Sequence, residues 1–325
     1  MRILQRRIIK RFIISLIVLF GISIIVFIFV HSQPGNPYIN MINPNVAPEQ
    51  TEAMLKDLGY YDPMPVKYIK WVSRAIKGDF GYSIQYKESV ISVINKRIGN
   101  TLILSIVATF ISILIAIPLG VLSAIKRNSV YDYIITILSF IGISIPSFFF
   151  GMLLIKWLAF DLRILPISGM KTPGENYEGV QAFLDTMKHM IMPTIVLALM
   201  NTASLMRYTR SSMIDNISKD FIQTARAKGL VERKAMIKHG FKNSLIPIIT
   251  ILCMQIPTIF SGALITETIF VWPGIGRLNY EAVLNRDYPL IMGILMIMAV
   301  IILLSNILAD ILYSLVDPRV RYGKE

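Results

Sequence analysis

Residues 12–30 have the sequence FIISLIVLFGISIIVFIFV, a run of 19 residues without Asp, Glu, Lys or Arg. A helix rises about 1.5 Å per residue, so about 20 apolar residues cross a hydrocarbon core of roughly 30 Å. Because lipid offers no hydrogen-bond partners to a free backbone, the crossing segment has to be helical. A soluble helix of this length would carry a polar face, which this run lacks. The run therefore predicts a transmembrane helix.

Five more runs free of these four residue types follow along the chain. They span residues 101–125, 134–155, 190–206, 245–266 and 288–309. The chain of 325 residues is 54% hydrophobic and 16% charged, whereas about 25% of the residues in soluble domains are charged. The first run is also longer than the roughly 7–15 apolar residues of a cleaved signal peptide. The sequence therefore predicts an all-α integral membrane protein with six transmembrane helices.

The distribution of basic residues predicts the orientation. Residues 1–11 contain five Lys or Arg and no acidic residue, which places the N-terminus in the cytoplasm. Alternation then places residues 126–133, 207–243 and 314–325 in the cytoplasm as well. These four segments hold 19 Lys and Arg in 68 residues, against 13 in the 118 residues of the three outer segments. Both termini are predicted to be cytoplasmic, and the net charge of +13 requires no nucleic-acid partner.

Four parts of the chain follow from this topology. They are the cytoplasmic N-terminus with the first helix (1–30), an extracytoplasmic cap (31–97), a five-helix core (98–313) with a cytoplasmic loop (207–243), and a cytoplasmic tail (314–325). In the cap, Pro48 fits the first turn of a helix that ends near Gly59. A second amphipathic helix is predicted before Gly78. Its apolar face consists of Val66, Ile69, Val72 and Ile76.

Groups that drive transport or catalysis inside a membrane are missing from these runs. Proton-driven and voltage-driven transporters place acidic or basic side chains at membrane depth, and the six runs contain none. Lys156 and Asp310 lie at the ends of runs, where snorkelling explains them. The sequence has no G-x-x-x-x-G-K-[ST] loop, and His239 has no ligand-spaced neighbour. We therefore predict no catalytic and no metal site, and uphill transport would need energy from another chain.

Polar uncharged side chains within or beside the runs have two readings. The candidates for a polar pathway are Ser144, Ser147, Asn201, Ser204, Gln255 and Thr258. Such side chains also join helices to one another by hydrogen bonds, and the sequence leaves both readings open. Prolines are predicted to break or kink four of the helices. They are Pro118, Pro146, Pro193 and Pro257.

The cytoplasmic loop has the pattern of two short helices. Residues 220–233, DFIQTARAKGLVER, read as a helix, a glycine stop and a second helix. Ser218 or Asp215 can cap the first helix, and Gly229 is placed for the left-handed residue after its end. Small residues are expected to leave one surface of this loop without large side chains, so that another protein could approach its backbone closely. They are Ala225, Ala227 and Gly229, within a ring of basic residues. The loop is either a solvated basic segment near anionic lipid or a docking element for a cytoplasmic protein.

Thr224-Ala225-Arg226-Ala227-Lys228-Gly229, followed by His239, Asn243 and Pro247, resembles the EAA loop of ABC importer permeases. The form is that of the peptide and nickel branch, because Gln223-Thr224-Ala225 stands where the general pattern begins Glu-Ala-Ala. Gly229 and Pro247 are also 18 residues apart, more than in the general pattern. Other stretches resemble the same branch in the same order. They are His31 to Pro37, Leu58-Gly59-Tyr60, Gly78 to Ser83, Glu267 to Leu278, Arg286 to Pro289, Ala309-Asp310 and Asp317-Pro318-Arg319.

This resemblance implies a six-helix fold of the ABC importer permease type and a coupling loop that inserts into a groove of a partner ATPase. The expected docking residues are Gln223, Thr224, Ala225, Arg226, Ala227, Lys228, Gly229 and Leu230. ATP and magnesium are expected on the ATPase subunits, with no cofactor on this chain. The expected outer gate, on the side of the binding protein, consists of Glu267, Trp272 and Arg277. For Glu267 an interfacial or capping carboxylate is the other reading.

The implied setting is a bacterial cell membrane, crossed several times. The implied partners are a second homologous permease subunit, two cytoplasmic ATPase subunits, an extracytoplasmic substrate-binding lipoprotein, membrane lipid and a peptide substrate. Nickel uptake by a related importer is an alternative within the family. A secondary transporter or channel is the alternative of a different class, which the charge-free runs and the docking loop disfavour.

Overall fold

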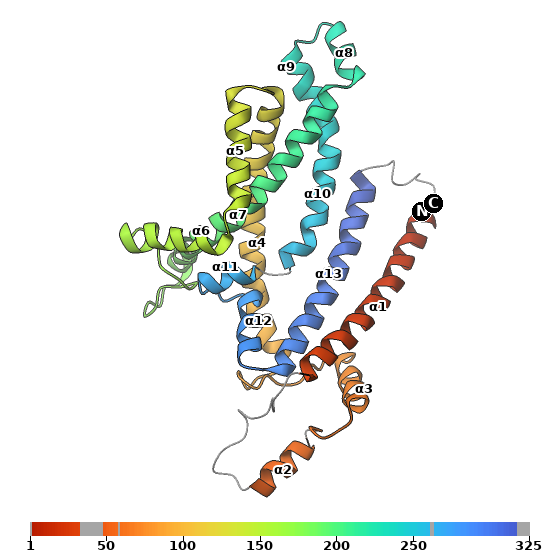
Figure 1. The fold of residues 1–325 in the computed structure, drawn as a ribbon, viewed down its shortest axis with the longest axis vertical. Coiled ribbons are helices and arrows are strands. Elements are labelled where there is room, and N and C mark those ends of the chain that lie inside the picture. The colour runs from red at the N-terminus through yellow and green to blue at the C-terminus, as the bar shows by residue number, and fades with distance from the viewer. Residues whose placement is uncertain (1, 33–47, 58, 261–262, 317–325) are drawn as a thin grey trace.

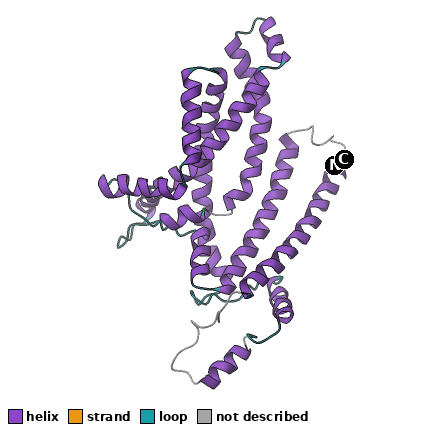
Figure 2. Cartoon of the chain, in the orientation of Figure 1, coloured by secondary structure: helices purple, strands orange, loops and turns teal. Residues whose placement is uncertain are grey.

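The computed structural model describes residues 2–32, 48–57, 59–260 and 263–316. Helices joined by loops make up this part of the chain, which contains one isolated β-bridge, between Tyr82 and Ser89, and no strand (Figure 2). The Asp317-Pro318-Arg319 motif and most of the motif after His31 lie outside the described residues.

Five helices of the described chain are long and apolar enough to cross a membrane. They are α1 (Arg2–His31), α4 (Val90–Ile125), α7 (Gly179–Ile217), α10 (Lys242–Phe260) and α13 (Tyr288–Val316). Each covers all or most of one predicted charge-free run, and together they form an elongated bundle (Figure 1). The predicted integral membrane fold is confirmed.

The remaining run, residues 134–155, is not one straight helix. It is divided between α5 (Val130–Ser144) and α6 (Ser147–Leu154), which continues as a π-helix over Ile155–Asp161. The two halves meet at an angle of 98°. Pro146 has no N–H to donate to the helix ladder, and it disfavours helical backbone at Ile145, whose ψ is 122°. The predicted break or kink at Pro146 is therefore confirmed, the bent pair counts as a sixth span if its two halves cross together, and α6 projects sideways from the bundle (Figure 1).

The other three prolines lie inside helices that continue through them. Pro118 is within the 36 residues of α4, and Pro193 is within the 39 residues of α7. Pro257 is within α10. Of the four prolines expected to break or kink a helix, Pro146 alone separates two described helices.

Helices α4 and α7 form the central pair of the bundle. At Gly120 of α4, an added Cβ would lie 2.7 Å from Thr209 Cβ and 2.8 Å from the carbonyl oxygen of Met206, both on α7. Only glycine permits this approach. Helix α5 joins the pair through Asp132, which is 3% exposed and accepts hydrogen bonds from Arg210 Nε and Nη2 of α7 at 2.7 and 2.8 Å. The hydroxyl of Ser123 in α4 also donates to Asp132.

A large apolar core lies at the other end of the bundle, where α1, α4, α12 (Ile275–Leu284) and α13 meet. Phe27, Ile94, Leu278 and Met292 are among its buried members. At the far end of α1, Arg11 forms an ion pair with Asp310 of α13.

Two helices are described in the segment that the sequence predicts to form a cap. They are α2 (Pro48–Asp57) and α3 (Met64–Ala75). The predicted apolar face of α3 is not its packing face, because Ile69 and Ile76 are 67% and 81% exposed. The helix instead packs Tyr68 and Trp71 against α1.

Candidate functional site

The loop that the sequence predicts to be cytoplasmic forms a helical hairpin at one extreme of the molecule. It consists of α8 (Asp220–Ala227) and the single turn α9 (Glu232–Ala235), and it lies at the opposite end from α2 and α3 (Figure 1). We call residues 220–235 the coupling hairpin. A π-helix, Met236–Phe241, connects α9 to α10. The hairpin therefore joins the ends of the two long helices α7 and α10.

Gly229 ends α8 in a Schellman motif. Its φ is +89°, its N–H donates to the carbonyl of Arg226, and the N–H of Leu230 donates to the carbonyl of Ala225. Leu230 then packs on the small core of Ile222, Ala225 and Ala235, as the motif requires. The predicted left-handed glycine is confirmed. An added Cβ at Gly229 would meet nothing within 4 Å, so the glycine is needed for its backbone angle and leaves an open surface in front of it.

Two details of the predicted hairpin are wrong. Ala225 is buried at 8% exposure against the second helix, so it is not part of the low outer surface. The N-cap of α8 is Lys219, without a side-chain hydrogen bond, while the Ser218 hydroxyl donates to the carbonyl of Asp215. The predicted docking residues that are exposed are Gln223, Thr224, Arg226, Ala227, Lys228 and Gly229, and Leu230 is half-buried.

Polar contacts hold the base of the hairpin to α7 and α10. Asn216 Nδ2 donates to Ser244 Oγ at 3.1 Å and to the carbonyl of Ser212 at 2.9 Å. Ser244 is 0% exposed, and its hydroxyl donates to the carbonyl of Gly240 at 2.8 Å. These bonds join α7, the π-helix and α10, so the base of the hairpin is held to both long helices by hydrogen bonds as well as by the chain itself.

The three residues predicted for the outer gate lie together at the opposite end of the bundle. We call residues 267–278, with the contacts they make on α4, the outer junction. Glu267 belongs to α11 (Leu264–Ile269) and is 0% exposed. Its carboxylate accepts hydrogen bonds from Thr101 Oγ1 of α4 at 2.8 Å and from the Arg277 N–H at 3.0 Å. Burial raises the pKa of Glu267 above its usual range, although these hydrogen bonds act in the other direction.

Two glycines make room for this carboxylate. An added Cβ at Gly274 would lie 2.4 Å from Glu267 carboxyl atoms, and one at Gly276 would lie 2.6 Å from Leu264 Cα and 3.0 Å from Glu267 Oε2. The turn that contains these glycines therefore wraps around Glu267. This carboxylate binds its own chain, which agrees with the reading of a capping group. A role in gating stays a prediction.

Trp272 fastens the same turn to α4. Its side chain is 0% exposed, and its Nε1 donates to the carbonyl of Asn100 at 3.0 Å. In return, Asn100 Nδ2 donates to the carbonyl of Pro273 at 2.8 Å. The Ile275 N–H donates to Thr101 Oγ1 at 2.8 Å. With the bond from Thr101 to Glu267, four hydrogen bonds join this part of the chain to α4.

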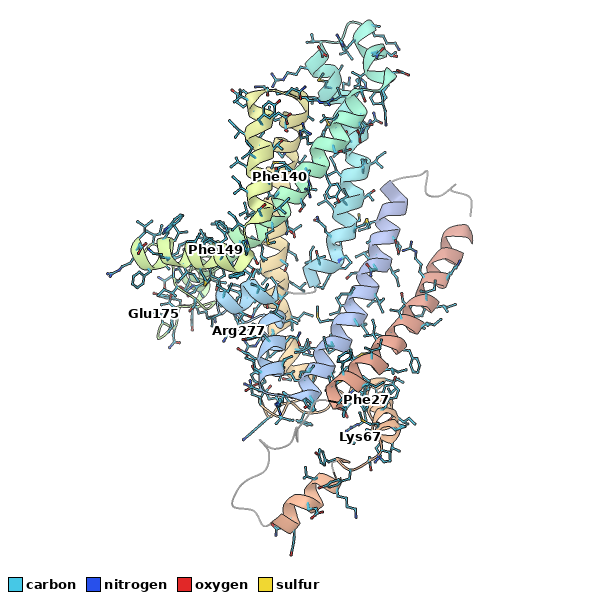
Figure 3. All side chains as sticks on the ribbon, viewed as in Figure 1. Phe27, Lys67, Phe140, Phe149, Glu175 and Arg277 are labelled. Atoms are coloured by element: carbon cyan, nitrogen blue, oxygen red, sulfur yellow. The ribbon has the colours of Figure 1, made fainter. Side chains whose placement is uncertain are left out.

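Arg277 is the most exposed of the three gate candidates, with 28% of its side chain accessible. Its Nε donates to Glu281 at 2.7 Å, and its Nη1 donates to the carbonyl of Val271 at 2.8 Å. The Tyr86 hydroxyl donates to the other oxygen of Glu281 at 2.8 Å. Burial, followed by the hydrogen bond to Glu281, raises the pKa of Tyr86 to about 12. Arg277 is labelled beside α11 and α12 in Figure 3.

Asp287 completes this end of the molecule, and sequence reasoning missed it. It is 0% exposed, accepts from Ser83 Oγ at 2.5 Å and from the Gln85 N–H at 3.0 Å, and caps α13 through the Leu290 N–H at 3.2 Å. Ser83 and Asp287 belong to two motifs that the resemblance singles out. Nothing in their spacing along the chain reveals that they meet.

The candidate pathway residues are spread over four helices. Ser144 ends α5, Ser147 begins α6, Asn201 and Ser204 lie on α7, and Gln255 and Thr258 lie on α10. Thr258 Oγ1 donates to the carbonyl of Gln255 at 2.6 Å, a bond within one helix. A cavity of about 340 Å³ between α7 and α10 is lined by none of the six. Its walls include Tyr208, Ser212, Asn216 and Pro247. That the six candidate residues line a transport pathway stays a prediction.

Two family models match the chain. The model described as "Binding-protein-dependent transport system inner membrane component" matches residues 116–322. The model for the N-terminal part, "Binding-prot-dependent transport system membrane comp, N-term", matches residues 4–105. The coupling hairpin and residues 267–278 fall within the first match, and Asn100 and Thr101 fall within the second.

Curated relatives extend over nearly the whole chain. The "Oligopeptide transport system permease protein AppB" of Bacillus subtilis (strain 168) is 42% identical over 316 residues, which are 97% of this chain and 99% of that protein. The "Dipeptide transport system permease protein DppB" of Escherichia coli (strain K12) is 35% identical over 322 residues, with 94% and 95% coverage.

A solved structure of a transporter resembles the fold. It is titled "Inward facing conformations of the MetNI methionine ABC transporter: CY5 native crystal form". The TM-score is 0.53 with 14% sequence identity, and the match covers 70% of this chain and 97% of that chain. At this identity the likeness concerns the fold alone.

Proposed function

The chain belongs to the family of binding-protein-dependent transport system inner membrane components, and we propose that it is the permease subunit of an ATP-driven importer of peptides. The observation that carries this proposal is the coupling hairpin. It is a small, exposed helical element without an active-site constellation, fixed by buried hydrogen bonds to two helices long enough to cross a membrane.

The hairpin provides the connection to an energy source. Its exposed face combines a low centre at Ala227 and Gly229 with the positive charge of Arg226 and Lys228. We propose that this face enters a groove of a cytoplasmic ATPase subunit, which binds ATP and magnesium. Closure of two such ATPases would move the hairpin together with α7 and α10. This displacement would switch the pathway between states open to opposite sides of the membrane.

The orientation follows from the same proposal. The hairpin lies in the cytoplasm, so both termini are cytoplasmic and the outer junction faces the substrate-binding lipoprotein. Chain segments 126–133 and 207–243 then carry the high density of basic residues expected for the inner side of a bacterial cell membrane. The outer junction anchors the receiving surface to α4 through Trp272 and Glu267.

A second, homologous permease subunit is proposed to complete the pathway. Each chain would contribute one half, lined by uncharged polar side chains that bind a peptide backbone weakly. The relatives support the substrate class, because they are named an oligopeptide and a dipeptide transport system permease protein. Nickel uptake remains the alternative within the family. In that case the selectivity for the metal would reside largely in the binding protein rather than in this chain.

Reconstitution tests the proposal. The chain is co-purified with its second permease and ATPases, placed in proteoliposomes, and supplied with the binding protein and a labelled peptide. We expect peptide accumulation that requires ATP and every subunit. Accumulation by this chain alone under a proton gradient would identify a secondary transporter, and accumulation of Ni²⁺ instead of peptide would identify the nickel alternative.

A further inference from the structure

Helix α3 presents three different faces. Tyr68 and Trp71 form the first, which packs on α1. Val66, Ile69 and Ile76 form the second, which is apolar and exposed by 39%, 67% and 81%. A third face is basic and follows the i, i+3, i+7 spacing of a helix surface. It consists of Lys67, Lys70 and Arg74, and Lys77 follows in the turn just after the helix.

The contacts of α3 place it beside the apolar part of α1. The Tyr68 hydroxyl lies 2.7 Å from Ser23 Oγ, and the Tyr68 ring lies 6.4 Å from Phe20 and 5.2 Å from Phe27. Ser23 precedes His31 by eight residues, about 12 Å along a helix axis. Helix α3 therefore begins its contact with α1 inside the charge-free run rather than beyond it. Phe27 and Lys67 are labelled close together at this end of α1 in Figure 3.

The basic face is not neutralised within the described chain. Lys70 pairs with Asp62 at 2.7 Å, but Arg74 and Lys77 have no acidic partner among the described residues and both are exposed. An exposed apolar stripe beside unpaired cations is the pattern of a helix that lies in a membrane interface. Acyl chains cover the stripe, and anionic headgroups bind the cations.

We propose that α3 is an interfacial helix that binds anionic lipid. Ile69 and Ile76 insert among the acyl chains of the leaflet that meets the His31 end of α1. Arg74 and Lys77 bind the phosphates of that leaflet. The aromatic residues Tyr68 and Trp71 fasten the helix to α1 at the depth where aromatic side chains collect in membrane proteins. This proposal concerns lipid alone and does not depend on the transported substrate.

A spin-label depth measurement tests the insertion. The full chain, with Cys253→Ala, carries Ile69→Cys or Arg74→Cys as the label position and is placed in nanodiscs that contain one part phosphatidylglycerol to three parts phosphatidylcholine. The chain with Cys253→Ala alone gives the background. Collision rates are measured with oxygen, which concentrates in the acyl region, and with a water-soluble nickel complex. We expect oxygen to exceed nickel several-fold at position 69, and the opposite order at position 74.

Three results at position 69 are possible in this experiment. Preference for oxygen supports the proposal. Preference for nickel means that the stripe faces water, and low rates with both reagents mean that a protein covers it. Either of these two results overturns the proposal.

The charge requirement has its own test. Arg74→Gln with Lys77→Gln should reduce the amount of phosphatidylglycerol that copurifies with the full chain in mild detergent by about half or more. Lys87→Gln with Lys96→Gln, in the same part of the chain but off α3, is the matched control and should leave it unchanged. An equal loss in both pairs, or no loss in either, would show that α3 has no special affinity for anionic lipid.

Discussion

Asp132 Oδ1 lies 2.7 Å from Arg210 Nε, which ties the beginning of α5 to α7 close to the coupling hairpin. With Ser123 of α4 bound to the same carboxylate, three helices converge on one side chain that is 3% exposed. This end of the bundle is the part that a cytoplasmic partner would have to displace. The ion pair and the Ser123 hydrogen bond therefore join α4, α5 and α7 at a single point.

Removing the cation from this pair should be strongly destabilising. Arg210→Gln leaves the buried Asp132 carboxylate without its charge partner, which we expect to cost about 3 kcal/mol. The unfolding temperature in detergent should fall clearly. Arg207→Gln, an exposed arginine one turn earlier on α7, is the control and should change stability by less than about 0.5 kcal/mol. Adding Asp132→Asn to Arg210→Gln should recover much of the loss, and equal effects of both arginine variants would contradict the structural role.

Gly229→Arg should block energy coupling without preventing membrane insertion. The variant places a long side chain in the open space before the hairpin and forces a non-glycine residue into φ +89°, which costs about 1–2 kcal/mol locally. We expect loss of ATPase co-purification and of uptake. Gly174→Arg is matched to it, because Gly174 also has a positive φ of +84° and nothing within 4 Å of an added Cβ, but it lies in another loop. Normal ATPase binding by Gly229→Arg would refute the docking role.

The buried carboxylate at the outer junction gives a pH dependence of known sign. Burial raises the folded-state pKa of Glu267 above the unfolded value near 4.5, so its stabilising contribution is complete below that value and declines as the pH rises through the folded pKa. The stability of the native chain relative to Glu267→Gln should therefore increase as the pH is lowered from 8 toward 5. Unfolding temperatures of both proteins across this range measure it. A difference that is constant or of opposite sign would show that Glu267 remains ionised with an ordinary pKa.

The proposed energy source can be separated from a proton gradient. In cells or vesicles where ATP is maintained, collapse of the proton gradient by an ionophore should leave peptide uptake nearly unchanged, because the charge-free runs offer no proton relay. Depletion of ATP at a constant gradient should abolish uptake. If uptake instead follows the gradient in proportion, the chain works as a secondary transporter.

The membrane fold and the coupling hairpin could be predicted because their signals are local. Charge-free runs specify helices in lipid, and a glycine after TARAK specifies a helix end at Gly229. The break at Pro146 was foreseen as a break or kink, but its 98° angle depends on what α6 packs against. Helical periodicity found the stripe of α3 correctly. It could not decide between that stripe and the Tyr68–Trp71 face, because both faces carry apolar side chains.

The outer junction was beyond sequence reasoning for a different reason. Ser83 and Asp287 are separated by 204 positions, and Thr101 and Glu267 by 166, so their pairing depends on how complete helices pack. The sequence identified Glu267, Trp272 and Arg277 as a group on one side of the membrane. It did not show that two of these side chains are fully buried in contacts with α4.

The length of α7 has a mechanical consequence. Its 39 residues form one continuous helix, about 58 Å long along its axis at the usual rise per residue, with the Asp185–Thr172 hydrogen bonds near one end and the Asn216–Ser244 bond near the other. A tilt of about 5° around its middle would carry each tip roughly 2–3 Å in opposite directions, given this helical rise. Because α7 is one continuous helix, a displacement of one end can move the other end directly, without any relay of side-chain rearrangements between them.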